Sequence, residues 1–227
     1  MFRVWNKIPE FMRVDEVRPY YEVLKKRIIS LFFKKVFDLF VSLILLVILS
    51  IPMCIIAVAI KIDSKGPVFY RQERITTYGK RFKIHKFRTM VVNADKIGTA
   101  VTIENDNRIT KIGKKLRKYR LDELPQVLDI LSGNMSFVGT RPEAVKYVEQ
   151  YKPEYRATLL LPAGITSEAS IQYKDEAKLL DRAENIDEVY INAILPEKMK
   201  YNLRSIRNFS LLNDISVMIR TVFAVWR

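Results

Sequence analysis

Apolar side chains follow one another almost without interruption from Val36 to Ile60. Asp38 is the one charged residue among these 25 positions, which otherwise hold mainly Val, Ile, Leu, Phe, Met and Ala. As one straight helix they would extend about 37 Å at about 1.5 Å per residue, enough to cross a hydrocarbon core of about 30 Å. We therefore predict a membrane helix over residues 34–62, a peripheral N-terminal extension over 1–33 and a folded domain over 63–227.

Two features of the apolar run complicate a simple membrane span. Pro52 removes a backbone hydrogen bond inside the helix and bends it, and the nearby Ser50 hydroxyl can cover a backbone group that the break frees. Basic residues flank both ends, although cationic loops prefer the cytoplasmic side. The residues alone therefore leave open a spanning helix and a re-entrant helix that returns to the same face. A buried core helix is less favoured, because the run exceeds the usual length of such a helix.

After Gly66-Pro67 the apolar period changes. Residues 68–74 and 81–87 alternate as strands do, and Thr77 to Lys80 supplies a turn, so we predict a small β-hairpin. Further helices are predicted over 109–119, 142–151, 196–207 and 211–226, with loops over 137–142 and 161–166. The last two helices are amphipathic and basic, and either lie on an anionic membrane surface or pack against the folded domain. The fold class is α+β, mainly helical.

Charge and rare residues narrow the chemistry. The net charge of +14 indicates an anionic partner, which is a nucleic acid, an anionic lipid or a phosphorylated substrate. Cys54 is the single cysteine, which excludes an intrachain disulfide. His85 is the single histidine, which excludes a multi-histidine metal site and a conventional zinc centre, and we interpret it as structural.

The candidate chemistry is a pair of adjacent carboxylates, Asp122 and Glu123, in a strongly cationic segment. Pro125 and the two acids suit the first turn of a helix, where neighbouring side chains point about 100° apart. One carboxylate could therefore face a reacting phosphorus while the other holds a metal. Adjacent acids alone more often begin a surface helix. Two cations leave the predicted hairpin where they can enter the same site, and we predict that both bind substrate phosphate: Lys86 and Arg88.

Several stretches together resemble one family, the monotopic phosphoglycosyl transferases, which are bacterial sugar transferases acting on polyprenyl phosphate. Each stretch is weak alone, but their order behind a proline-broken apolar helix is specific. The matching stretches are Gly66-Pro67-Val68-Phe69-Tyr70-Arg71-Gln72, Lys86-Phe87-Arg88-Thr89-Met90, Arg108-Ile109-Thr110-Lys111-Ile112-Gly113, Leu121-Asp122-Glu123-Leu124-Pro125-Gln126, Met135-Ser136-Phe137-Val138-Gly139 and Arg141-Pro142.

That resemblance implies a re-entrant membrane helix in the bacterial inner (cytoplasmic) membrane, with the catalytic domain on the cytoplasmic face. It implies a magnesium-dependent reaction in which Asp122 attacks the β-phosphate of a UDP-sugar and releases UMP. Polyprenyl phosphate, usually undecaprenyl phosphate, then accepts the sugar phosphate, and a membrane glycoconjugate is begun. Glu123 would hold Mg²⁺, and three cations match phosphate-binding positions, Lys86, Arg117 and Arg141. We expect the surrounding cations to keep the pKa of Asp122 low.

Two departures from the family pattern leave the reacting groups in place. Thr140 replaces a usual proline, and Asn134 stands where an acid is common. The run from Ser167 to Ser170 differs from larger relatives and weakens any transfer of sugar identity. An alternative function is a basic membrane-anchored protein that binds nucleic acid or lipid without catalysis, although no nucleic-acid motif supports a nucleic-acid partner. The oligomeric state is not readable from the sequence, and a dimer stays open.

Overall fold

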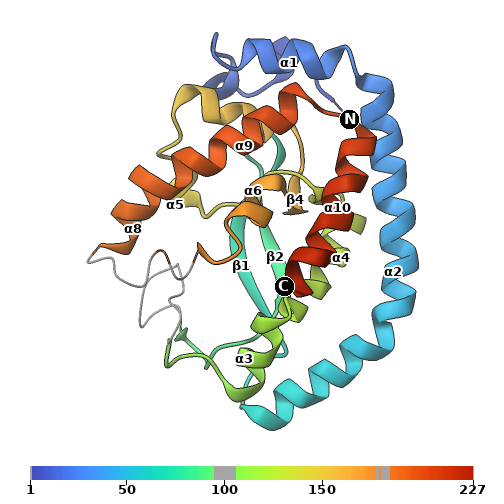
Figure 1. Cartoon of the computed structure of the whole chain (residues 1–227), viewed down its shortest axis with the longest axis vertical. Helices are drawn as coiled ribbons and strands as arrows, with labels where there is room; N and C mark the ends of the chain where they lie inside the picture. The colour runs from blue at the N-terminus through green and yellow to red at the C-terminus, as the bar shows by residue number, and fades with distance from the viewer. Residues whose placement is uncertain (1, 95–105, 177–178, 180–184, 227) are drawn as a thin grey trace.

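The computed structural model describes residues 2–94, 106–176, 179 and 185–226. In these residues the protein is mainly helical, with two small two-stranded sheets among the helices (Figure 1). This confirms the mainly helical α+β class. One long helix, α2 (Ile28–Asp63), runs along one side of the other elements.

The N-terminal segment contributes to a hydrophobic core instead of lying at the periphery. It forms the short helices η1 (Trp5–Lys7) and η2 (Glu10–Met12) and the helix α1 (Arg18–Lys25). Met12, Val17 and Leu24 are fully buried, against Leu160 and Phe209 among others. Several of the scattered apolar residues of the segment predicted as a peripheral extension therefore fill places in this core, whereas Val4 and Phe11 stay exposed.

Helix α2 (Ile28–Asp63) contains the whole predicted membrane segment. It has 36 residues and includes Pro52, and its second half turns toward α3 (Lys111–Lys118) (Figure 1). The Ser50 hydroxyl donates to the carbonyl of Val47 over 2.7 Å, a back-bond of the kind that often bends helices. Residues on both sides of Pro52 pack on the same folded domain: Val41 and Leu45 before it, Ile60 after it.

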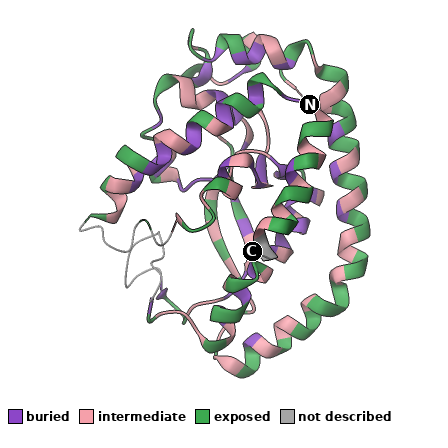
Figure 2. Ribbon diagram, in the orientation of Figure 1, coloured by how far each residue is buried: buried purple, intermediate pink, exposed green. Residues whose placement is uncertain are grey.

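Most of the α2 surface is left uncovered by the protein (Figure 2). Its most apolar 18-residue window has a mean hydropathy of 3.1, and 6% of that window is buried. A core helix of a soluble protein would be mostly buried, so the third alternative does not describe α2. Length and composition fit a membrane helix.

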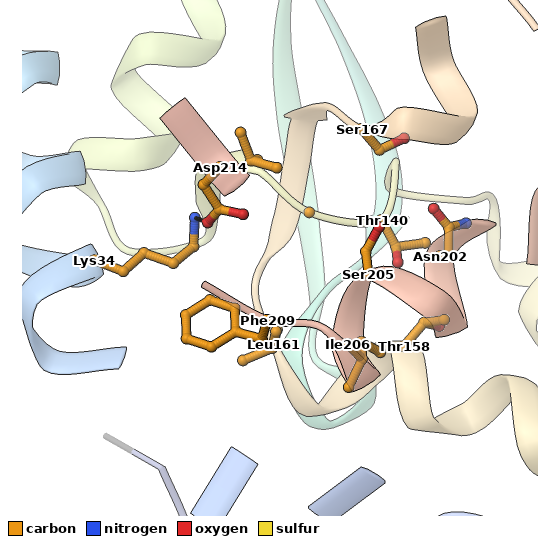
Figure 3. Close-up of a pocket in the computed structure, with 12 residues that line it drawn as sticks. Lys34, Thr140, Thr158, Leu161, Ser167, Asn202, Ser205, Ile206, Phe209 and Asp214 are labelled. Atoms are coloured by element: carbon orange, nitrogen blue, oxygen red, sulfur yellow. Dashed lines mark hydrogen bonds and ion pairs between the residues drawn. The ribbon is translucent and has the colours of Figure 1, made fainter. Parts of the chain in front are cut away.

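A polar cluster near the start of α2 is buried, although most of this helix is exposed. Lys34 and Asp38 of α2 are buried, and the Lys34 ammonium donates to Asp214 of α10 (Leu211–Trp226) over 2.5 Å. The backbone N–H of Phe137 donates to Asp38 over 3.4 Å. A small cavity of about 40 Å³ adjoins the pair, and Figure 3 shows the Lys34 and Asp214 side chains pointing toward one another at its edge. These contacts fix α2 to the domain.

The predicted β-hairpin is confirmed. Strands β1 (Phe69–Ile75) and β2 (Arg81–Phe87) pair antiparallel, and η3 (Thr77–Gly79) makes the turn. Alternation places Phe82, Ile84 and Lys86 on one face of β2. Phe82 and Ile84 fill the core, and Lys86 continues this face toward the carboxylate pair.

A second sheet takes up part of the two predicted loops, so the loop prediction was wrong for residues 137–138 and 163–166, while 139–142 and 161–162 do lie outside helices and strands. Strands β3 (Met135–Val138) and β4 (Ala163–Thr166) pair in parallel. Each has only four residues, too few to show an alternating pattern. Gly139 and Gly164 permit the backbones to cross, because a Cβ on Gly164 would lie 2.2 Å from the nitrogen of Gly139. This crossing positions the loop that carries Arg141.

The remaining helices surround the two sheets. The helices predicted over 196–207 and 211–226 are confirmed as α9 and α10. The helix predicted over 109–119 is present as the shorter α3, and of the helix predicted over 142–151 only the four residues of α5 are α-helical. The elements are α3 (Lys111–Lys118), η5 (Leu121–Gln126), α4 (Val127–Leu131), α5 (Val145–Val148), η6 (Pro153–Leu160), α6 (Glu168–Gln172), α8 (Ile186–Val189), η7 (Tyr190–Ile194) and α9 (Leu195–Arg207).

Candidate active site

The carboxylate pair lies in a tight helical turn between two α-helices. Arg120 has a left-handed backbone (φ 56°) and separates α3 from η5. This sharp change of direction turns the first residues of η5 inward, so Asp122 and Glu123 are each only 8% exposed. The predicted helix start is present, but its first turn is 3₁₀ and its acids are buried. A solvated surface position for the pair is therefore excluded.

Glu123 is held by two cations from distant parts of the chain. Its carboxylate accepts from the Lys86 ammonium of β2 over 2.9 Å. The Arg141 guanidinium also contacts both of its oxygens, one of them over 3.3 Å. Burial opposes ionisation of Glu123, but the charges of Arg141 and Lys86 outweigh it and hold the pKa well below its usual range. Glu123 is thus ionised and fixed in place.

Asp122 differs from its neighbour in both bonding and charge. Its Oδ1 is buried and has no hydrogen-bond partner among the described residues. Burial and the adjacent charge of Glu123 raise the pKa of Asp122, and Lys86, Arg117 and Arg120 offset this only in part. The expectation of a low pKa was therefore wrong: the cations expected to lower it are present, but two of them are committed to Glu123 and burial is nearly complete.

The four predicted phosphate-binding cations do not all converge. Lys86 and Arg141 meet at Glu123, and half-buried Arg117 of α3 interacts electrostatically with Asp122. Arg88 is directed elsewhere: its guanidinium donates to the carbonyls of Ser64 and Lys65 over 2.7 and 2.5 Å. It thereby fastens β2 to the end of α2. Phosphate binding by Arg88 stays a prediction that this geometry does not favour.

A buried polar network behind Arg141 was not found from the sequence. Tyr190 of η7 donates to Glu143 over 2.6 Å, and Lys198 of α9 donates to the Tyr190 oxygen over 3.0 Å and to Glu176 over 2.9 Å. The negative charges of Glu143 and Glu176 also act on Arg141. The network connects the C-terminal helices to the residue that holds Glu123. The acidic residue Glu143, two positions after Arg141, was the feature of the sequence that could have indicated this network.

The single histidine is paired with a second buried acid. Asp129 of α4 is 1% exposed and accepts from both the backbone N–H and the ring Nδ1 of His85, each over 2.8 Å. Phe69 lies edge-on to the His85 ring. These contacts are consistent with the structural interpretation of His85. Asp129 could have been suspected, because it is the lone charge in an apolar helical stretch.

The same carboxylates offer oxygen ligands that could hold magnesium. Among the described residues no group of three or more His, Cys, Asp or Glu side chains could enclose a metal. Protein-bound Mg²⁺ usually takes only one or two carboxylates and completes its shell with water and substrate phosphates. Two adjacent carboxylates fit that smaller requirement, and one buried oxygen of Asp122 has no partner within the described part of the chain.

Comparison with known proteins agrees with these motifs. The sequence matches the model of the bacterial sugar transferase family over residues 29–227. The chain belongs to this family. The resemblance drawn from its short motifs is thereby confirmed at the level of the family.

Three relatives show the range of activities named within this family. A UDP-glucose:undecaprenyl-phosphate glucose-1-phosphate transferase of Klebsiella pneumoniae is 39% identical over 86% of the chain and 40% of that relative. An Aeromonas hydrophila protein named for N-acetylgalactosamine phosphate transfer to undecaprenyl phosphate is 32% identical over 84% of the chain and 43% of its own length. The exopolysaccharide production protein PSS of Rhizobium leguminosarum is 35% identical over 85% of the chain and 94% of its own length. The chain thus spans about two fifths of the first two relatives.

Proposed function

We propose that this protein transfers a sugar-1-phosphate from a UDP-sugar to polyprenyl phosphate through a covalent intermediate on Asp122. The observation that carries the proposal is the contrast within the carboxylate pair. Glu123 is fixed by Lys86 and Arg141, whereas Asp122 keeps a buried oxygen that no described residue hydrogen-bonds. A nucleophile needs such a free oxygen, and a residue that only balances charge does not.

The proposed reaction has two displacements at one phosphorus atom. An Asp122 oxygen attacks the β-phosphorus of the UDP-sugar, and the bond from that phosphorus to the bridging oxygen breaks, so UMP leaves with its electron pair. A phosphate oxygen of polyprenyl phosphate then attacks the same phosphorus. The bond to Asp122 breaks, which regenerates the carboxylate and yields a diphosphate-linked sugar.

The surrounding cations supply charge and orientation in this scheme. Phosphoryl transfer depends mainly on positioning and on neutralising oxygen charge. Arg141 and Arg117 present planar donor groups that suit phosphate oxygens. Glu123, with phosphate oxygens, would hold Mg²⁺, which when bound neutralises charge on the diphosphate. The positive charge of Mg²⁺ held beside Asp122 would also lower the pKa of this carboxyl group and favour its ionised form.

We infer that α2 is a re-entrant membrane helix in the bacterial inner membrane, with the site on the cytoplasmic face. Both halves of α2 pack on one domain, which supports a return to the same side. The lipid acceptor gives a reason for a membrane helix beside a catalytic domain. Cysteines placed near residues 25 and 65 and labelled from each side would test this topology, since labelling from opposite sides contradicts it.

The central experiment measures UMP release from a panel of UDP-sugars with polyprenyl phosphate and Mg²⁺. Asp122→Asn should abolish release while the fold stays intact. Wild-type protein incubated with nucleotide-sugar and Mg²⁺, but without polyprenyl phosphate, should carry a sugar-phosphate adduct, located by mass spectrometry at Asp122. Full turnover by Asp122→Asn would remove the proposed nucleophile. The panel would also identify the sugar, and the product would direct the search for the glycan that is begun.

A further inference from the structure

An exposed stripe of lysines lies on helix α3, outside the carboxylate site. The four lysines of α3 occupy positions i, i+3, i+4 and i+7 and therefore share one face. All four are exposed, and Lys61 and Lys65 at the end of α2 are exposed as well. The stripe is defined as Lys111, Lys114, Lys115 and Lys118.

Helix α3 is fixed rigidly to the end of the membrane helix. The carboxylate of Asp63 accepts from the backbone N–H of Ile112 over 3.1 Å. On the face opposite the stripe, Leu116 packs against Ile60 of α2. A Cβ on Gly113 would lie 2.0 Å from the carbonyl oxygen of Thr89, so this face admits no side chain there. The lysine stripe therefore stays beside the point where α2 ends.

The stripe has no anionic partner within the described part of the protein. None of its lysines, nor Lys61 or Lys65, forms an ion pair with a described carboxylate. Tyr119, next to the stripe, is 51% exposed, and tyrosine is enriched at the boundary between membrane and water. Apolar residues of α2 are exposed close by, with Ile62 at 82%. A membrane surface offers both kinds of contact.

We propose that the lysine stripe binds the headgroups of anionic phospholipids at the membrane surface. The proposal rests on the membrane placement of α2 given under the proposed function. A basic residue near an anionic surface contributes a factor of roughly five to local binding, and the effect falls off within a Debye length. Several lysines on one face should therefore enrich anionic lipid beside α3, next to the segment that carries Asp122.

The test measures which lipid gathers at α3. A donor fluorophore is attached at Tyr119→Cys in a Cys54→Ser background, and the protein is placed in phosphatidylcholine vesicles. Energy transfer to trace acyl-chain-labelled phosphatidylglycerol is compared with transfer to trace acyl-chain-labelled phosphatidylcholine. We expect severalfold enrichment of phosphatidylglycerol, reduced by added salt. Equal transfer to the two lipids would overturn the proposal.

A matched pair of variants assigns the effect to the stripe. Replacement of Lys114, Lys115 and Lys118 by Gln should bring the enrichment close to one. Replacement of three other exposed lysines by Gln changes the net charge equally and should leave enrichment unchanged; these are Lys83, Lys152 and Lys174. Equal loss in both variants would show a general charge effect and contradict the assignment.

Two further arms separate this proposal from the enzyme activity. In the first arm, unlabelled polyprenyl phosphate is added in an amount equimolar with phosphatidylglycerol. If it displaces the phosphatidylglycerol, the stripe selects the lipid acceptor, and the proposal that it binds anionic phospholipids is overturned. UMP release with saturating acceptor in detergent should be equal in wild type and in the stripe variant. If even the wild type releases no UMP, the proposed function fails while the lipid enrichment is still measured.

Discussion

The guanidinium of Arg141 contacts both carboxylate oxygens of Glu123. This contact joins the loop after β3 to η5, two segments that are 18 residues apart. It also leaves the charge of Glu123 compensated although the side chain is buried. The fork geometry of arginine provides two donors to one carboxylate, which lysine cannot reproduce.

Arg141→Lys should therefore lower turnover although it preserves the charge. Loss of one positioned donor to the charge that develops in a transition state typically costs about 10²–10³-fold in rate, as measured for oxyanion holes. The measurement is kcat and KM for UMP release, with circular dichroism to confirm the fold. Arg81→Lys, at an exposed arginine on β2, is the matched control. Wild-type turnover in Arg141→Lys would show that the fork is not used.

The opposite pKa shifts of the two acids predict opposite effects on stability. The raised pKa of Asp122 means that ionisation of this group opposes folding at neutral pH, so Asp122→Asn should raise the unfolding temperature by a few degrees. The lowered pKa of Glu123 means that its ionised form favours the folded state, so Glu123→Gln should lower that temperature. Thermal unfolding of both variants in one detergent measures the contrast.

The pH dependence of these two effects has a defined direction. For Asp122, the wild-type disadvantage relative to the Asn variant is present above the raised folded-state pKa and disappears as the pH falls below the usual aspartate range. For Glu123, the advantage of wild type over the Gln variant is lost as the pH falls through its lowered folded-state pKa. Identical shifts in the two variants would contradict the assignment of roles.

The local patterns that could be predicted from sequence are those with enough residues to repeat. The β1–β2 hairpin, α9, α10 and the apolar run of α2 each contain several periods, and each was predicted within a few residues. The motif around Asp122 and Glu123 identified the family for a different reason, which is the fixed order of short stretches. Neither kind of signal required knowledge of tertiary contacts.

What could not be predicted depends on contacts between distant residues. The β3–β4 pairing brings Met135 next to Ala163, and neither four-residue strand shows a period of its own. Arg88 lies in a matching motif, yet its partners are carbonyls at the end of α2. The pKa of Asp122 depends on burial, which the cationic sequence around it does not reveal.

Lys86 should control the acid side of the pH–rate profile. Among the cations that lower the pKa of Asp122, Lys86 has the largest effect. Lys86→Met should therefore raise this pKa further, so the rise of kcat/KM with increasing pH should occur at higher pH than in wild type. Lys83→Met, on the exposed face of the same strand, should leave the profile in place. An unshifted profile in Lys86→Met would show that ionisation of Asp122 does not limit the rate.

The crossing of β4 with the loop after β3 should tolerate no side chain at Gly164. A Cβ there would lie 2.2 and 2.4 Å from the nitrogen and oxygen of Gly139, so Gly164→Ala must displace the loop that carries Arg141. We expect lower thermal stability together with reduced UMP release. Gly133→Ala is the control, because its Cβ meets nothing within 4 Å and its positive φ (73°) costs only about 1 kcal/mol. Equal behaviour of the two variants would mean that the crossing is not a tight constraint.

The buried Lys34–Asp214 pair should be essential for attaching α2 to the domain. The two side chains are 7% and 15% exposed, and Asp38 lies 3.9 Å from the same ammonium. Lys34→Met leaves two buried acids without their cation, which typically costs about 3–5 kcal/mol and should lower the unfolding temperature by roughly 10 °C. The double variant Lys34→Met/Asp214→Leu removes one acid as well and should recover most of this loss, because an apolar pair can replace a buried ion pair. Thermal unfolding of wild type and both variants in the same lipid nanodiscs provides the comparison. A double variant no more stable than Lys34→Met would show that the ion pair has a role that apolar packing cannot replace.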